Sequence, residues 1–185
     1  RAKRLFDDSL EIARKYGQSF INPEHILIAL LNEGKGYIGV IYNPYSDETF
    51  VGVKGHGAYL NGKPIKVNKY PLSASLISVG TTPYNKEMAD ITFDKMKNIF
   101  KHCRDTRRSG SATIDMCYVA CGRYDGYYEY VLAPWDYAAV ATVIEEAGGV
   151  IGTAEPFTWG YTKSITIIAG TKANFDELKK IVTKI

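Results

Sequence analysis

The chain has 185 residues and a formal net charge of +3, with 45% hydrophobic and 23% charged residues. These values are ordinary for a folded globular protein and exclude an intrinsically disordered chain. The net charge is too small to argue for nucleic acid, and no apolar run approaches the roughly 20 residues that cross a bilayer. We therefore expect no nucleic-acid partner and no membrane partner.

The first 34 residues predict a helical hairpin. Apolar side chains in residues 1–16 recur at spacings of three and four, which places them on one face of a helix. Gly17 is typical of a helix end, and the Asn-Pro-Glu sequence at residues 22–24 is typical of a helix start. Gly34 closes this second helix. Two short helices bury too little surface to be stable alone, so we expect them to pack on the rest of the chain.

Residues 37–67 predict an antiparallel meander. Residues 37–42 and 49–54 are expected strands, and the turn between them is rich in Asn, Pro and Ser. Asn61 and Gly62 are a strong signal for a tight hairpin turn. The two strands are apolar on both faces, so each face of this sheet needs a cover. We expect the helical hairpin, or self-association into a homo-oligomer, to provide it.

Beyond residue 71, predicted strands and helices alternate, which indicates a layered α/β arrangement. The expected strands are residues 75–80, 124–131, 149–153 and 164–169. The expected helices are residues 85–100, 111–122, 135–147 and 173–184. The predicted fold class is therefore α/β: an N-terminal helical hairpin, an antiparallel meander and an α/β segment, together forming one folded unit.

Several short motifs follow one another in a characteristic order and spacing. They lie at residues 39–44, 54–62, 108–112, 122–129, 134–139 and 146–149. The most specific is the Pro-Trp-Asp-Tyr-Ala-Ala sequence at residues 134–139, which is followed one helix later by Glu-Ala-Gly-Gly. Together these motifs make residues 35–185 resemble the carboxyl-terminal part of the inositol monophosphatase family.

The resemblance implies roles for five residues. Asp136 matches the family's metal-binding aspartate, and the alternative is a helix N-cap. Glu129 matches the residue that contacts substrate hydroxyls, and the alternative is an exposed acid at a strand end. Gly110, Ser111 and Ala112 match the loop and helix start that face the substrate, where backbone amides suit an anion. The alternative there is an ordinary cap.

The resemblance also implies a chemistry, the hydrolysis of phosphomonoesters with Mg²⁺, which requires several oxygen ligands. In the family, the other metal ligands come earlier in the chain, in Gly-Glu-Glu and Asp-Pro-x-Asp-Gly-Thr motifs, and the residue that activates water lies in that same earlier region. Neither motif occurs in this sequence. One carboxylate cannot hold a catalytic magnesium cluster, so we expect an inactive chain. Mg²⁺ and a sugar phosphate are expected to bind only if other residues rebuild the site.

Residues 1–34 resemble a second family. Residues 13–17 and 23–34 are similar to the first helices of a Clp-type chaperone N-terminal domain. The junction near Gly34 predicts an engineered or recombinant chimera of a non-autonomous hairpin and a truncated phosphatase-like portion at residues 35–185. Two alternatives stay open. One is an active Mg²⁺-dependent phosphatase, and the other is a module that binds a peptide or adaptor through its Clp-like helices.

A pair of cysteines and a cluster of arginines each have an ordinary structural interpretation beside a functional one. Cys117 and Cys121 have a spacing that zinc sites use, but no further ligands follow, so we expect small buried hydrophobes. An odd number of cysteines favours a reducing cytosol over a disulfide framework. Arg104, Arg107 and Arg108 form either a solvated basic face or a surface that attracts phosphate.

Overall fold

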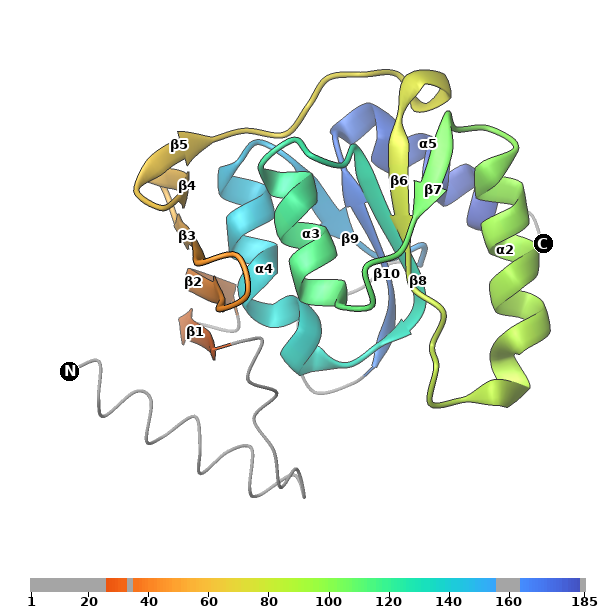
Figure 1. The fold of residues 1–185 in the computed structure, drawn as a ribbon, viewed down its shortest axis with the longest axis horizontal. Helices are drawn as coiled ribbons and strands as arrows, with labels where there is room; N and C mark the ends of the chain where they lie inside the picture. The colour runs from red at the N-terminus through yellow and green to blue at the C-terminus, as the bar shows by residue number, and fades with distance from the viewer. Residues whose placement is uncertain (1–25, 33–34, 156–163, 184–185) are drawn as a thin grey trace.

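The computed structural model describes residues 26–32, 35–155 and 164–183, which form two five-stranded sheets (Figure 1). The first is an antiparallel meander with strands in chain order: β1 (Ile26–Asn32), β2 (Lys35–Asn43), β3 (Glu48–Val53), β4 (Gly57–Leu60) and β5 (Lys63–Ile65). The second has the order β7-β6-β8-β10-β9: β6 (Leu76–Val79), β7 (Asp105–Arg107), β8 (Gly126–Leu132), β9 (Val150–Gly152) and β10 (Ile165–Gly170). Strands β7 and β8 run parallel to β6, whereas β10 is antiparallel to β8 and β9.

The described helices are α2 (Ala89–Phe100), α3 (Ala112–Ala120), α4 (Pro134–Glu146) and α5 (Lys172–Thr183), with short 3-10 turns at Leu72–Ala74 and Lys86–Met88. Helices α3 and α4 lie between the two sheets, and α2 and α5 cover the other face of the second sheet (Figure 1). This layered α/β architecture confirms the predicted fold class for the described residues. No helix in this part of the chain is long and apolar enough to cross a membrane.

Alternation along the strands of the second sheet divides the buried side chains into two cores. Tyr127 of β8 lies in the core against α3 and α4, and the next residue, Tyr128, lies in the core against α2 and α5. The first core also contains Ile41 and Phe50 of the first sheet. Helices α3 and α4 are therefore packed from both sides.

Helix α4 approaches the first sheet closely because the strands carry glycine where they face it. A Cβ atom on Gly39 would lie 2.0 Å from the carbonyl oxygen of Ala139, and one on Gly52 would lie 2.6 Å from the Cα of Val143. Contacts this short are forbidden in a close-packed interior. Any side chain at these two positions would push the helix away from the sheet.

The carboxyl-terminal end of α4 is tied to the same sheet through its last residue. Glu146 accepts hydrogen bonds from the backbone amides of Gly55 and Gly57, each at 2.9 Å. Both glycines have positive φ angles, 78° and 89°, which few other residues adopt without strain. The turn between β3 and β4 thus presents two amides to one carboxylate, and α4 is held to the sheet at its end as well as along its length.

Most of the predicted elements beyond residue 35 are confirmed. The turn at Asn61 and Gly62 has φ angles of 48° and 74°, as a type I′ hairpin requires. Strand β7 was not predicted, because three residues are too few to show a periodic pattern.

The second half of the predicted hairpin is wrong. Residues Ile26–Asn32 form an antiparallel strand on β2, with Ile26 opposite Tyr42 and Asn32 opposite Lys35. A short, continuously apolar run fits a helix and a buried strand equally well, and here the edge of β2 decides between them. The predicted first helix at residues 1–16 and the cap at residues 22–24 lie outside the described residues.

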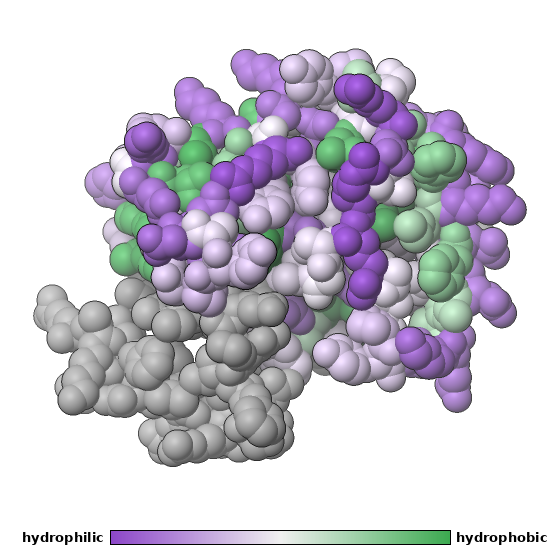
Figure 2. All heavy atoms as spheres, viewed as in Figure 1, coloured by the Kyte–Doolittle hydropathy of each residue, from purple (hydrophilic) through white to green (hydrophobic). Residues whose placement is uncertain are grey.

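The face of the molecule drawn in Figure 2 mixes hydrophilic and hydrophobic residues. Figure 2 shows hydrophobic residues along the right-hand edge, where α2 lies, broken up by hydrophilic ones. The exposed aromatic residues of α2 are Phe93 and Phe100, at 56% and 54% exposure. Single exposed apolar side chains of this kind are normal on protein surfaces.

We predict that Gly39→Ala lowers the free energy of unfolding by about 3 kcal/mol, because the added methyl group meets the backbone of α4. Gly36→Ala is the matched control, because its Cβ would lie 2.2 Å from the side-chain hydroxyl of Thr142, which can rotate away. Chemical denaturation of both variants measures the difference. Equal losses at the two positions would contradict the proposed backbone contact.

Candidate functional site

The carboxyl ends of three neighbouring strands and the start of two helices meet at one edge of the second sheet. Strands β7 and β8 flank β6 and run parallel to it, so all three end at the same edge. Residues 108–111 lead from β7 into α3, and Ala133 leads from β8 into α4. Ligands of open α/β sheets bind outside the carboxyl ends of the strands. The exposed amides at helix starts favour anions there.

Glu129 lies on β8 at this edge. It projects from β8 on the same face as Tyr127 and is only 6% exposed. Its Oε1 accepts a hydrogen bond from the backbone N–H of Thr82 at 3.0 Å, and its Oε2 accepts one from the Tyr127 hydroxyl at 2.5 Å. The alternative of an exposed strand-end acid is therefore wrong.

Asp136 lies beside Glu129, in the first turn of α4. The N-cap of α4 is Ala133, and no side chain caps this helix, so the N-cap alternative for Asp136 is wrong. Burial, together with the nearby charge of Glu129, raises the pKa of Asp136 to about 6. The backbone carbonyl of Asp136 accepts a hydrogen bond from the Thr113 hydroxyl at 2.9 Å, which ties the start of α3 to the start of α4.

The three predicted residues at the start of α3 lie in a regular capping arrangement. Ser111 is the N-cap, and its hydroxyl accepts from the amide of Ile114 at 3.4 Å. Gly110 is exposed with a φ angle of +100°, and Ala112 is the first residue of the helix. The ordinary-cap interpretation is therefore correct for Ser111. It is compatible with a substrate-facing role, because capping leaves the helix start at the same edge as Glu129.

Three residues that the sequence analysis did not select hold the parts of this edge in place. Tyr127 and Thr82 hold the carboxylate directly, and burial beside the Glu129 carboxylate raises the pKa of Tyr127 well above its usual value. The phenol therefore stays protonated and donates. Asp115, in the first turn of α3, is 2% exposed and accepts from the Ser78 hydroxyl at 2.7 Å. It anchors α3 to β6.

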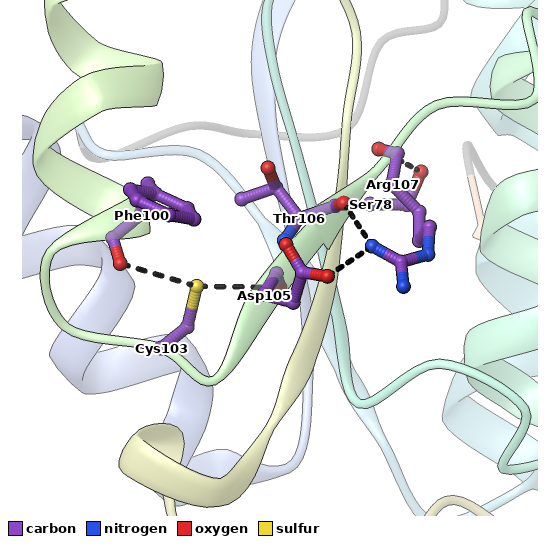
Figure 3. A network of polar contacts seen from close by, with 6 residues as sticks. All are labelled: Ser78, Phe100, Cys103, Asp105, Thr106 and Arg107. Atoms are coloured by element: carbon purple, nitrogen blue, oxygen red, sulfur yellow. Dashed lines mark hydrogen bonds and ion pairs between the residues drawn. The ribbon is translucent and has the colours of Figure 1, made fainter.

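The predicted basic cluster does not form a preorganised phosphate site. Arg107 pairs with Asp105 on the same short strand, and the Ser78 hydroxyl donates to the Arg107 carbonyl at 3.3 Å (Figure 3). In the same network, the Cys103 thiol donates to the Asp105 carbonyl at 3.4 Å. Burial raises the pKa of the Cys103 thiol, which disfavours the reactive thiolate. The solvated-face interpretation fits Arg107 better.

The described residues contain no ready-made metal centre. No group of three His, Cys, Asp or Glu side chains among them lies close enough together to hold a metal ion, and this includes Asp136 with its acidic neighbours. Cys117 is fully buried in the first core and Cys121 lies against it, as expected of small hydrophobes. Asp136 is therefore one carboxylate beside Glu129, and not part of a cage.

Comparison with known proteins identifies the family of this chain. The sequence matches the Inositol monophosphatase family over residues 23–185. The chain belongs to the inositol monophosphatase family. The match begins at residue 23, ahead of the boundary expected near residue 35, and so takes in β1. Residues 1–44 also match the Clp repeat (R) N-terminal domain, so the two matches overlap over residues 23–44.

Some relatives are named as Nus factor SuhB and others as inositol monophosphatases. The chain is 38% identical over 127 residues to Nus factor SuhB of Pasteurella multocida, and 40% identical over 129 residues to Inositol monophosphatase 3 of Solanum lycopersicum. Each alignment covers 68% of this chain and 48% of the relative, so the chain spans about half the length of these curated relatives.

Solved structures with the same fold confirm the family. The extragenic suppressor protein suhB of Bartonella henselae superposes with a TM-score of 0.79 at 32% identity, over 94% of this chain and 65% of that one. The inositol monophosphatase of Anabaena superposes with a TM-score of 0.76 at 32% identity, over 94% and 68%.

The raised pKa of Asp136 predicts a pH-dependent gain in stability for Asp136→Asn. Because the folded-state pKa of about 6 lies above the ordinary value of 3.8, ionisation of Asp136 costs stability as the pH rises through 6. The variant should be more stable than the parent by about 3 kcal/mol at pH 8, with little difference near pH 3.5, because one pKa unit corresponds to about 1.4 kcal/mol. Thermal unfolding of the parent and the variant between pH 3.5 and pH 8 measures this difference in stability. Asp94→Asn, on the exposed face of α2, is the control. A gain in stability that does not depend on pH would contradict the raised pKa of Asp136.

Proposed function

We propose that this chain forms the substrate-facing part of a Mg²⁺-dependent phosphomonoesterase site for inositol or sugar phosphates, and that the chain alone is catalytically inactive. The observation that carries the proposal is the convergence of Glu129, Asp136 and the start of α3 at the carboxyl ends of β6 and β8. Family membership supports the substrate class, and the relatives named as inositol monophosphatases support the reaction type.

Different residues at this edge suit different groups of a sugar or inositol phosphate. The amides at the start of α3 suit the phosphate group, and Glu129 suits the hydroxyl groups of a cyclitol or sugar, because an ionised carboxylate only accepts hydrogen bonds. Asp136 is the one residue here that matches a metal ligand. Mg²⁺ is commonly held by one or two carboxylates together with substrate phosphate and water, and when bound it polarises the phosphate and activates a water molecule.

The proposed inactivity follows from the lack of further metal ligands near Asp136 among the described residues. The described residues supply no second and third metal-binding side chain near it. The Gly-Glu-Glu and Asp-Pro-x-Asp-Gly-Thr motifs are also missing from the printed sequence. With one carboxylate, Mg²⁺ would be held weakly, and the attacking water would have no residue to activate it. Binding of a phosphate ester is therefore expected to survive without turnover.

We predict no Mg²⁺-dependent phosphate release from inositol 1-phosphate by the purified, folded chain. The assay compares release with Mg²⁺, with EDTA, and with the Asp136→Asn variant, and a cooperative thermal transition shows that the sample is folded. Release that EDTA and Asp136→Asn both abolish would overturn the proposed inactivity. It would establish an active phosphatase whose remaining ligands come from other residues or from another chain.

We also propose that the chain is a chimera, whose junction lies before β1. The overlapping matches to two families support a junction between residues 23 and 44. Strand β1 favours the early end of this interval, because Ile26–Asn32 extends the first sheet. The described cysteines are free thiols, which fits a reducing compartment such as the cytosol.

The outer face of the first sheet, opposite α4, requires a cover. Along β3, Glu48, Phe50 and Gly52 are buried on the face toward α3 and α4, whereas Val51 and Val53 are only partly buried on the other face. We propose that the segment before β1 packs on this face. Deleting residues 1–25 should then lower the midpoint of thermal unfolding, and an unchanged midpoint in a monomeric sample would refute this. A concentration-dependent dimer would instead identify a second copy as the cover.

A further inference from the structure

We propose that Tyr127 and Thr82 are positioning residues, which fix Glu129 as a hydrogen-bond acceptor for the hydroxyl groups of a cyclitol or sugar phosphate. The inference rests on the proposed function, because it needs a hydroxyl-bearing ligand at this edge. It adds a socket, formed by Gly80, Thr82 and Tyr127, that holds the carboxylate before any ligand arrives.

Two hydrogen-bond donors from different parts of the chain bind the Glu129 carboxylate, one at each oxygen. The Tyr127 hydroxyl is 2.5 Å from Oε2, a length typical of a charge-assisted O–H···O⁻ bond. Tyr127 is fully buried in the first core, so its hydroxyl cannot swing away. The Thr82 amide is 3.0 Å from Oε1. Two donors at fixed positions leave Glu129 a single orientation.

The turn after β6 is shaped around this carboxylate. A Cβ on Gly80 would lie 2.1 Å from the Cδ of Glu129, so glycine is what leaves room for it. Thr82 has a φ angle of +46°, a strained conformation that is an outlier for a β-branched residue. In this conformation the Thr82 amide donates to Glu129. Strain of this kind persists where the surrounding structure requires one particular geometry.

Stability alone does not explain the arrangement. A buried carboxylate that has only two neutral donors, with the acid Asp136 close by, is costly. The Thr82 hydroxyl is also buried, at 7% residue exposure, without a hydrogen-bond partner among the described residues. An ionised carboxylate has about four acceptor positions, and the socket uses two. The remaining positions, together with the Thr82 hydroxyl, suit a ligand that brings hydroxyl groups.

Tyr127→Phe tests the proposal, because it removes one oxygen and keeps the ring in the core. NMR titrations give the affinity of each variant for inositol 1-phosphate and for inorganic phosphate, which lacks the ring hydroxyls. We expect Tyr127→Phe to weaken binding of inositol 1-phosphate about tenfold, the effect of one lost hydrogen bond of about 1.4 kcal/mol, and to leave phosphate binding unchanged.

The neighbouring tyrosine provides a matched control. Tyr128 is also buried, but it faces the other core and its hydroxyl has no hydrogen-bond partner among the described residues. Tyr128→Phe should leave both affinities unchanged. If Tyr127→Phe does not fold, Gly80→Ala replaces it, because the added methyl group displaces the Glu129 carboxylate.

A double-mutant cycle separates positioning from a merely structural role. If Tyr127 acts through Glu129, Tyr127→Phe should cause no further loss of inositol 1-phosphate affinity in a Glu129→Gln background. Additive losses, or an unchanged affinity in Tyr127→Phe alone, would overturn the inference and leave the proposed function intact. If the parent binds inorganic phosphate and inositol 1-phosphate equally or not at all, the proposed function fails and the inference fails with it.

Discussion

The contact between the backbone of α4 and the glycine-bearing strands of the first sheet is the constraint on which the rest of the structure depends. Gly39 and Gly52 allow the helix to lie directly on β2 and β3. Glu146 fixes the far end of the helix to the turn between β3 and β4. The near end then places Asp136 beside α3 and β8. A helix displaced by one methyl group would carry Asp136 out of register with Glu129.

The sequence predicted the elements whose pattern is long enough to be unambiguous. Strands β2 and β3 were predicted as apolar segments on either side of a turn, and the hairpin at Asn61 followed from its turn residues. Helices α4 and α5 were predicted from the succession of strands and helices beyond residue 71. Strand β7 has three residues and carries no pattern. Ile26–Asn32 was assigned to a helix because the Asn-Pro-Glu sequence before it is typical of a helix start, and its apolar run fits a helix as well as a strand. Its state is decided by hydrogen bonds to β2, which local sequence does not encode.

The candidate site was predictable only where a short motif marked it. Glu129, Asp136 and the start of α3 were selected by resemblance, whereas the groups that hold them were not. Thr82 reaches Glu129 across 47 positions and Ser78 reaches Asp115 across 37, so only the folded chain brings them together. Tyr127 did leave a signal, since residues two apart on a strand share a face.

The pairing of β1 with β2 has a consequence for any recombinant version of this protein. Strand β1 is the last in its sheet, so β2 is shielded on that side by seven residues of chain. Cutting the polypeptide near residue 34 would strip this strand and bare a long row of unpaired amides and carbonyls on β2. Such a bare edge recruits strands from other molecules and leads to aggregation. Truncations that begin before Ile26 keep the edge protected.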